Sequence, residues 1–148
     1  MLDAARIEAI LARGRHAPCV ESLGLEFLDW SEGGCRLRAR HDPRFDGVLR
    51  GFHGGMLANV ADCAAWFAIA TQIGPDEYLL TTDLHIRYLN PCLTDAIAEA
   101  RVIKLGRTLC PVLVELFDAA AQMVAVAQVT YIRAGNLGLA SAAGAAVG

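Results

Sequence analysis

A His-Gly-Gly turn followed by a solitary acid is the feature of this sequence best suited to chemistry. The turn is His53-Gly54-Gly55, and it opens an apolar run of helical length in which Asp62 is the only charged residue before Pro75. Backbone N–H groups at a helix start favour negative charge and can stabilise an oxygen that becomes negative during a reaction. A carboxylate in apolar surroundings is costly unless it is paired, hydrogen-bonded or protonated, which makes Asp62 a candidate base or nucleophile.

The spacing within this segment has a consequence for assembly. Gly54 and Asp62 are eight residues apart, which is about 12 Å along a helix axis. One small carbonyl group cannot easily contact both. If both act on the same substrate, a second copy of the chain must bring its own Asp62 to the first copy's Gly54, with the two helices roughly antiparallel. The spacing therefore predicts a homodimer with two equivalent sites at a two-fold interface.

Each of these residues also has an ordinary structural explanation. Gly54-Gly55 would serve as a tight helix start, and His53 would serve as a cap. Asp62 would be a core acid bonded to backbone groups. Its isolation on an apolar helix favours a function for Asp62, whereas both explanations stay open for His53 and for the glycines taken alone.

The composition predicts one globular domain over residues 1–148. The chain is 55% apolar and 20% charged, which provides a substantial core and little room for a second domain. Its net charge of −3 lacks the basic excess of a nucleic-acid-binding protein. Arg36, Arg38 and Arg40 alternate along one predicted strand, a pattern that favours a solvated face. We therefore expect no nucleic-acid partner.

The cysteines and histidines predict neither disulfides nor a metal site. The five cysteines are odd in number, widely spread and form no C-x-x-C pair, which is typical of reduced thiols in a cytosolic protein. The four histidines fall in no metal-ligand spacing, so we expect no metal or cofactor. Asp3, Arg6 and Glu8 stand where an export signal would need an apolar core, so the expected location is the cytoplasm.

The apolar segment Met56–Ile73 raises the question of a membrane span. Asp62 near its middle would cost about 2.5–3.5 kcal/mol on insertion, and no basic cluster follows the segment. The sequence after it alternates like a soluble sheet. A buried helix without membrane contact is the better interpretation.

Further elements are predicted on either side of the central helix. Residues 3–14 show helical spacing, and Gly14 ends that short helix. Leu23–Trp30 and Gly34–Arg40 predict a hairpin, and three or four more strands follow the central helix. The connections are too short for parallel crossovers, so the sheet should be antiparallel. The tail, residues 135–148, is almost all Ala, Gly, Leu and Ser and is expected to be loose.

The central helix is apolar nearly all round, so something must cover most of its circumference. A curved antiparallel sheet of five to six strands would do so, and it predicts an α+β fold with a core at about residues 23–133. Pro111 inside a strand pattern predicts an edge or a bulge. Small residues that point inward would let the strands approach the helix closely, and we expect this of Ala98, Ala100, Ala125 and Ala127.

This arrangement resembles the hotdog-fold acyl-CoA thioesterases, most closely the phenylacetate-pathway (PaaI-like) type, also called the acyl-CoA thioesterase 13 type. The likeness covers roughly Leu23 to Arg133 and rests on several motifs in the family's order. After the His-Gly-Gly turn and its acid, Tyr88-Leu89-Asn90-Pro91 is similar to the family's strand that ends in an aromatic, two variable residues and Pro. Lys104-Leu105-Gly106-Arg107-Thr108 is similar to its Gly-basic turn.

The resemblance implies hydrolysis of an acyl-CoA thioester to free acid and CoA, at a site shared between the subunits of a homodimer. It implies that the Gly54 N–H holds the thioester oxygen, while Asp62 either activates water or attacks the carbonyl itself. His53 would orient the turn or contact the substrate, and Thr81 would help to place the water or the acid. The implied substrate-binding residues, along the CoA arm and its phosphates, are Gly55, Tyr88, Asn90, Lys104, Gly106 and Arg107.

Some alternatives stay open at this point. Gly47 and Arg50 stand where many family members have Asn and Gly. A non-catalytic acyl-CoA-binding protein and an acyl-CoA hydratase or dehydratase are the competing functions, although His53 and Asp62 do not clearly supply the His and acid arrangement of the latter. The identity of the acyl group, the choice between the two roles of Asp62, and the pairing of dimers into a homotetramer are also undecided.

Overall fold

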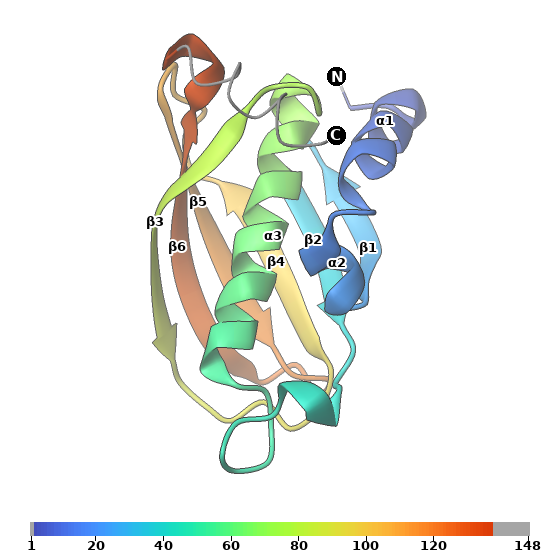
Figure 1. Ribbon diagram of the computed structural model, residues 1–148, viewed down its shortest axis with the longest axis vertical. Helices are drawn as coiled ribbons and strands as arrows, with labels where there is room; N and C mark the ends of the chain where they lie inside the picture. The colour runs from blue at the N-terminus through green and yellow to red at the C-terminus, as the bar shows by residue number, and fades with distance from the viewer. Residues whose placement is uncertain (1, 138–148) are drawn as a thin grey trace.

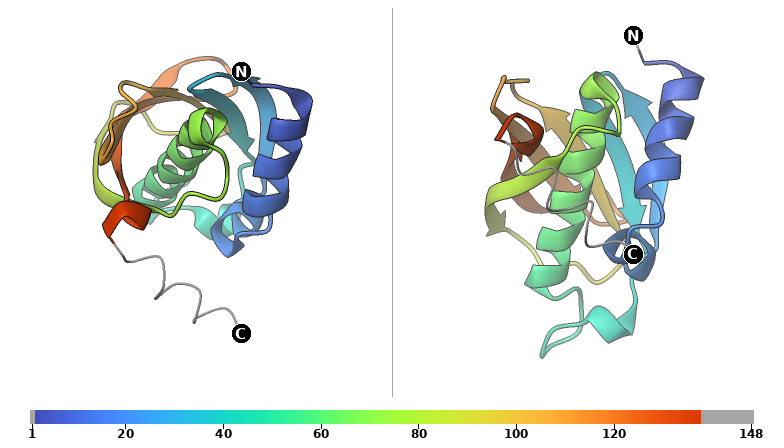
Figure 2. Two further views of the ribbon diagram at one scale, coloured as in Figure 1. Left: turned by 90° about the horizontal axis from the view of Figure 1, so that it is seen from above. Right: turned by 45° about the horizontal axis from the view of Figure 1, so that its top comes forward.

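A long helix, α3 (Gly54–Ile73), forms the centre of the molecule. The computed structural model describes residues 2–137. Over this range α3 is surrounded by the curve of a single sheet, as Figure 1 and the view from above in Figure 2 show. Most of its residues from Leu57 to Thr71 are buried, as expected for a helix that is apolar nearly all round.

In the described part of the chain the sheet has six strands, all paired antiparallel, in the order β1-β2-β4-β5-β6-β3. Three of the neighbouring pairs, β1–β2, β4–β5 and β5–β6, are joined by short connections, whereas β2–β4 and β6–β3 are not consecutive in the chain. The predicted α+β hotdog fold is therefore confirmed, with six strands. Their bounds are Leu25–Ser31 for β1, Gly34–Ala39 for β2, Leu79–Tyr88 for β3, Ala96–Val102 for β4, Leu109–Phe117 for β5 and Met123–Arg133 for β6.

Small residues let the sheet pack closely on α3. Ala98 and Ala100 of β4 and Ala125 and Ala127 of β6 are all buried, as predicted. Larger side chains such as Phe67 of α3 and Leu37 of β2 fill the remaining core and are almost fully buried. The position of the helix is therefore set by contacts along most of its length, which holds its residues at defined places over the sheet.

Two N-terminal helices lie beside α3 on its other side (Figure 2). The first, α1 (Ala4–Gly14), is capped by the Asp3 side chain, which accepts a bond of 2.8 Å from the Arg6 N–H. It ends at Gly14, as predicted. The second, α2 (Pro18–Ser22), was not predicted, because five residues are too few to show helical periodicity.

Two short 3₁₀ helices complete the described chain. They are η1 (Pro43–Phe45), before α3, and η2 (Ala134–Leu137), after β6. The prediction of a loose tail falls mainly on residues 138–148, which lie outside the described residues.

The expectation that Pro111 marks a sheet edge or a bulge is wrong. Strand β5 lies inside the sheet, between β4 and β6, and the register irregularity in β5 is between Leu116 and Phe117. The Pro111 carbonyl accepts a bond from Ile103, just past the last residue of β4. The N–H and the carbonyl of one residue point to the same side of a strand in an antiparallel sheet. The side of Pro111 that lacks an N–H therefore faces the chain just beyond the end of β4, so no hydrogen bond within the β4 strand is lost.

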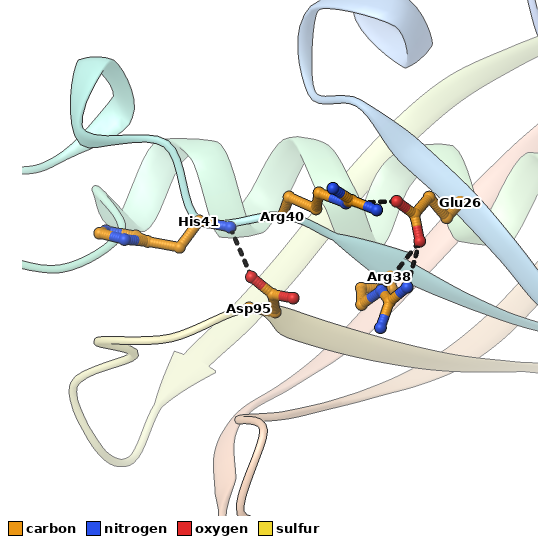
Figure 3. Close-up of polar contacts among 5 residues, drawn as sticks. All are labelled: Glu26, Arg38, Arg40, His41 and Asp95. Atoms are coloured by element: carbon orange, nitrogen blue, oxygen red, sulfur yellow. Dashed lines mark hydrogen bonds and ion pairs between the residues drawn. The ribbon is translucent and has the colours of Figure 1, made fainter.

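The alternating arginines of β2 and of the residue that follows it are paired with acids on the outer face of the sheet. Arg36 lies 3.0 Å from the Glu99 carboxylate, and both Arg38 and Arg40 donate to Glu26 of β1 (Figure 3). These pairs neutralise much of the charge along β2, in agreement with the prediction of a solvated face. At the end of this group the His41 N–H donates to Asp95 at 2.9 Å, which ties the chain after β2 to the start of β4.

By length and composition, α3 alone among the helices of residues 2–137 is apolar enough to cross a membrane. In the fold, 61% of that apolar window is buried against the rest of the chain. Burial of this extent is typical of a core helix.

Candidate active site

The start of α3 leaves one backbone donor without an acceptor. The His53 Nδ1 accepts a bond of 2.9 Å from the Gly55 N–H, and the His53 carbonyl accepts from Met56 and Leu57. Within residues 2–137 the Gly54 N–H has no acceptor. His53 is thus the helix cap, and its Nδ1 must be unprotonated to accept that bond. Of the two glycines, only Gly54 offers a free N–H, at the positive end of the helix dipole.

Tyr88 packs directly against this helix start. A Cβ atom added to Gly54 would lie 2.9 Å from the Tyr88 ring carbon Cζ, so only glycine fits without a shift of that ring. The Tyr88 hydroxyl donates a hydrogen bond to the Gly54 carbonyl. Burial raises the pKa of Tyr88, which keeps its hydroxyl protonated and able to donate. The structure therefore brings together two residues that the sequence analysis assigned to oxyanion and substrate binding.

Asp62 lies two turns further along α3, and a neighbouring hydroxyl holds its carboxylate. Thr81 of β3 donates a bond of 2.9 Å from Oγ1 to the Asp62 Oδ1. Thr81 reaches this position beside an irregularity in the pairing of β3 with β6, between Thr81 and Asp83. The resemblance implies that Thr81 helps to place the water or the acid, and in the fold its hydroxyl contacts the acid directly.

Tyr131 is a further residue at this site that the sequence analysis did not identify. It stands opposite Thr81 on β6, and its hydroxyl donates a bond of 2.9 Å to the Asp62 backbone carbonyl. Burial is the main cause that raises the pKa of Tyr131, with the negative charge of Asp62 adding to it. The only signal in the sequence was a tyrosine inside a strand, whose buried hydroxyl needs a partner.

Asp62 forms part of the wall of a pocket of about 410 Å³. Trp66 and Phe67 of α3 contribute an aromatic surface, with ring centroids 5.0 Å apart in an edge-to-face arrangement. Residues of α1 and α2 form a further part of the wall, which the sequence analysis did not connect with the site. Gly14 permits this contact, because a Cβ there would lie within 2.9 Å of both aromatic rings. The other lining residues include Ala17, Cys19, Val20, Asn59, Cys63, Leu79, Leu80 and Thr81.

Gly54 and Asp62 open into different hollows of one chain. Gly54 and Tyr88 line a second pocket of about 450 Å³ that Asp62 does not reach, and Gly54 is absent from the pocket at Asp62. The eight-residue separation along a continuous helix corresponds to about 12 Å. A single chain therefore does not bring the free N–H and the carboxylate to one carbonyl group.

The other residues assigned to substrate binding lie at opposite ends of β3. Asn90, just after β3, donates from Nδ2 to the Met123 carbonyl at 2.9 Å, so its amide holds the start of β6. Lys104 is exposed in the β4–β5 turn, which lies by the Leu79 end of β3. The nine steps from Leu79 to Tyr88 correspond to roughly 30 Å.

Gly106 is needed in that turn for steric reasons. A Cβ at this position would lie 2.2 Å from the Leu109 carbonyl oxygen. The Gly106 carbonyl accepts a bond of 3.2 Å from Arg133, which also forms an ion pair with Glu77. Arg107 follows in the same turn and is exposed. The turn thus presents Lys104 and Arg107 on an anchored backbone.

The loop before the His-Gly-Gly turn depends on a different glycine from the one in the family pattern. Gly51 has a φ of 109°, and a Cβ there would lie 2.8 Å from the Cys92 carbonyl oxygen. Gly47 has only ordinary contacts, the nearest at 3.7 Å, and Arg50 is exposed. Asp46 bonds to the His41 Nε2 at 2.7 Å, so its carboxylate already has a partner.

Within residues 2–137, no group of three or more His, Cys, Asp or Glu side chains is placed to hold a metal ion. The polar groups at the two hollows include the Gly54 N–H, the Asp62 carboxylate and the hydroxyls of Thr81, Tyr88 and Tyr131. These groups can hold an anionic oxygen, accept a proton and position a carboxylate. An enzyme that transfers an acyl group to water needs these three roles.

Comparison with known sequences shows that a family model matches about half of the chain. The model described as "Thioesterase superfamily" matches residues 51–125, a range that includes α3, the Asp62–Thr81 pair and the β4–β5 turn. A protein of Halobacterium salinarum named "Putative esterase VNG_1336C" is 32% identical over 91 residues. That match covers 58% of this chain and 60% of the relative, so the chain spans less than two thirds of the relative's length.

Comparison with solved structures finds the same fold. The Escherichia coli PaaI protein from the phenylacetic acid degradation operon is 19% identical with a TM-score of 0.80, over 90% of this chain and 96% of that protein. A hypothetical thioesterase protein of Streptococcus pneumoniae, solved with coenzyme A, is 19% identical with a TM-score of 0.66, over 73% of this chain and 84% of that protein.

Proposed function

The chain belongs to the thioesterase superfamily, and we propose that it hydrolyses an acyl-CoA thioester to the free acid and CoA at sites shared between two copies of the chain. The observation that carries this proposal is the Asp62 carboxylate, which the Thr81 hydroxyl holds at the wall of an apolar pocket. The Gly54 N–H at the start of the same helix, free of an acceptor within residues 2–137, supplies the complementary electrophilic group.

In the first route, Asp62 acts as a general base. It takes a proton from a water molecule, whose oxygen attacks the thioester carbonyl carbon. The carbonyl oxygen becomes negative and accepts the Gly54 N–H, an interaction that is worth about 3–4 kcal/mol in other acyl-transfer enzymes. The C–S bond then breaks, and the CoA sulfur leaves as a thiolate that takes the proton from Asp62.

In the second route, Asp62 attacks the carbonyl carbon itself. The C–S bond breaks with release of the CoA thiolate, and an anhydride joins the acyl group to Asp62. Water then cleaves the anhydride and regenerates the carboxylate. Thr81 suits both routes, because its hydroxyl orients the carboxylate oxygen that it contacts.

A second copy of the chain is part of the proposal, because Gly54 and Asp62 are too far apart on one helix. Strand β3 is at an edge of the sheet and, among residues 2–137, pairs only with β6. Two copies that pair their β3 edges antiparallel would set the Tyr88 end of one beside the Leu79 end of the other. This arrangement would bring the Gly54 start of one helix toward the partner's acid, and Asn90 toward the partner's β4–β5 turn.

CoA is the proposed leaving group because the β4–β5 turn carries cationic side chains, and in the proposed dimer this turn faces the partner's Asn90. Lys104 and Arg107 are both exposed there and suit the phosphates of a nucleotide-bearing thiol. The coenzyme A bound to the Streptococcus pneumoniae thioesterase of this fold supports the assignment. The apolar pocket beside Trp66 and Phe67 would take the acyl group.

The proposal is tested by release of free thiol from a panel of aromatic, short-chain and medium-chain acyl-CoA thioesters. We expect turnover by the native chain and loss of most of it in Asp62→Asn, by about 10²- to 10⁴-fold, as for removal of other general bases. Asp76→Asn is the matched control, because Asp76 is an exposed acid in the turn after α3. Binding of acyl-CoA without thiol release, or full activity of Asp62→Asn, would overturn the proposal.

A second measurement separates CoA recognition from hydrolysis. Lys104→Ala and Arg107→Ala should raise KM for acyl-CoA but leave KM unchanged for the same acyl group on pantetheine, which lacks the nucleotide. An equal effect on both thioesters would rule out a phosphate-binding role for the turn.

A further inference from the structure

Two cysteine side chains meet in the wall of the pocket at Asp62. Cys19 lies on α2 and Cys63 on α3, and their Sγ atoms are 3.7 Å apart although the residues are 44 positions apart in the sequence. Both line the pocket, and Cys63 directly follows Asp62. Within residues 2–137, no other two thiols lie within hydrogen-bonding distance of each other.

We propose that Cys19 and Cys63 form a reversible disulfide that fixes α2 against α3 beside Asp62. A disulfide has an S–S length of about 2.05 Å, so the two sulfur atoms must approach by about 1.7 Å. Helix α2 is the element that can supply this movement. It has five residues, of which only Val20 is buried, whereas α3 is packed within the sheet.

The two thiols differ in a way that sets the order of reaction. Cys19 is exposed, whereas Cys63 is buried. Burial raises the pKa of the Cys63 thiol, and the neighbouring Cys19 and Asp62 raise it further. Since the thiolate is the reactive form, Cys19 reacts first with an external oxidant, and Cys63 completes the bond from inside the pocket.

A low-molecular-weight disulfide, RSSR, is sufficient as the oxidant. The Cys19 thiolate attacks one sulfur of RSSR, which breaks its S–S bond and releases RS⁻; this takes up the proton that Cys19 lost. The Cys63 thiolate then attacks the Cys19 sulfur of the mixed disulfide and releases the second RS⁻, which takes the Cys63 proton. Two protein thiols are oxidised, and one RSSR is reduced to two RSH.

The bond would alter the pocket because it shortens the distance between two of its walls. Helix α2 would be drawn toward α3, next to the carboxylate and to the aromatic surface of Trp66. We expect the oxidised protein to lose thioester turnover and dithiothreitol to restore it. This effect on turnover rests on the proposed function, whereas formation of the disulfide does not.

The disulfide is tested on the full chain with glutathione disulfide as the probe. Intact mass and a non-reducing peptide map should show a Cys19–Cys63 link within one chain, without bound glutathione. In Cys63→Ser the reaction should stop at a glutathione adduct on Cys19, and Cys19→Ser should form neither the adduct nor the link. Cys35→Ser is the control and should still form the link, since Cys35 is buried on β2, is not part of the wall of this pocket, and burial raises its pKa to about 12.

A glutathione adduct that persists on Cys19 in the native chain, or a link that joins other cysteines, would overturn the disulfide. A Cys19–Cys63 link that leaves turnover unchanged would overturn the effect on the pocket. If the protein hydrolyses no thioester, the mass measurement still decides the disulfide, so the two failures are distinguishable.

Discussion

The hydroxyl of Thr81 donates a hydrogen bond of 2.9 Å to the Oδ1 of Asp62, from a strand to the helix that crosses it. The backbone carbonyl of Asp62 accepts a second hydrogen bond, from the Tyr131 hydroxyl. Both donors come from neighbouring strands and stand opposite each other in the β3–β6 ladder. The carboxylate is thereby held in position without an ion pair to either strand.

The first prediction concerns this bond. Thr81→Val removes a hydrogen bond to a charged group, worth about 1.5–3 kcal/mol, so kcat should fall by roughly ten- to a hundredfold. Thr81→Ser should keep most of the activity. The matched control is Thr82→Val, since the Thr82 hydroxyl bonds to the Thr130 carbonyl and not to Asp62. Steady-state thiol release measures all three, and full activity of Thr81→Val would show that the bond has no role in turnover.

The second prediction isolates the Gly54 N–H. Gly54→Ala and Gly54→Pro both place a carbon against the Tyr88 ring, but only proline removes the donor. Proline is tolerated at the first position of a helix, and the His53 ψ of 135° suits a residue before proline. Gly54→Pro should therefore be slower than Gly54→Ala by about 10²- to 10³-fold, the usual effect of an oxyanion donor.

A control for these variants is Gly47→Ala, which meets only ordinary contacts and should match the native chain in stability and turnover. Equal rates for Gly54→Pro and Gly54→Ala would mean that the backbone donor is not used.

The third prediction concerns His53 as a cap. His53→Ala removes the acceptor for the Gly55 N–H and should lower the free energy of unfolding by about 0.5–2 kcal/mol. His53→Asn should keep most of that stability, because asparagine is a favourable cap. Denaturant midpoints measure the stability, and turnover should follow it. A His53→Asn protein that is stable but inactive would instead show that the imidazole acts on the substrate.

The fourth prediction tests the shared site by mixing two inactive chains. Asp62→Asn and Gly54→Pro each damage both sites of their own homodimer, but a mixed dimer has one site with an intact Gly54 and an intact Asp62. Subunit exchange in an equal mixture should therefore restore about a quarter of the native activity. A mixture that exchanges subunits but remains inactive would place both groups in one chain.

The fifth prediction concerns acid stability. The hydrogen bonds from Arg38, and then Arg40, hold the pKa of Glu26 below its ordinary value. A lowered folded-state pKa stabilises the fold above the unfolded-state pKa of about 4.3, and this contribution disappears as the pH falls through the folded-state pKa. Native chain and Glu26→Gln should thus differ in urea midpoint near neutral pH and converge in acid. Glu8→Gln, at an exposed position on α1, should match the native chain at every pH.

Much of the fold follows from short-range patterns in the sequence. The apolar run after Gly54 predicts α3, the alternation of Ala98, Ala100 and Val102 predicts β4, and the short connections predict antiparallel pairing. These patterns are visible because helix and strand periodicities repeat within a few residues. The prediction failed at α2, which is too short to be periodic, and at Pro111, whose tolerance depends on where the neighbouring strand ends.

The candidate site divides in the same way. The His-Gly-Gly turn, Asp62 and their eight-residue spacing are properties of one segment, so the sequence by itself determined the helix start and the lone acid, and it predicted a second copy of the chain. Only the tertiary structure decided that Gly54 and not Gly55 keeps a free N–H, since the cap bond of His53 depends on side-chain orientation. It also brought Tyr131 to Asp62 and Cys19 to Cys63, across 69 and 44 residues, because such contacts arise from packing of the whole core and leave no periodic trace in the chain.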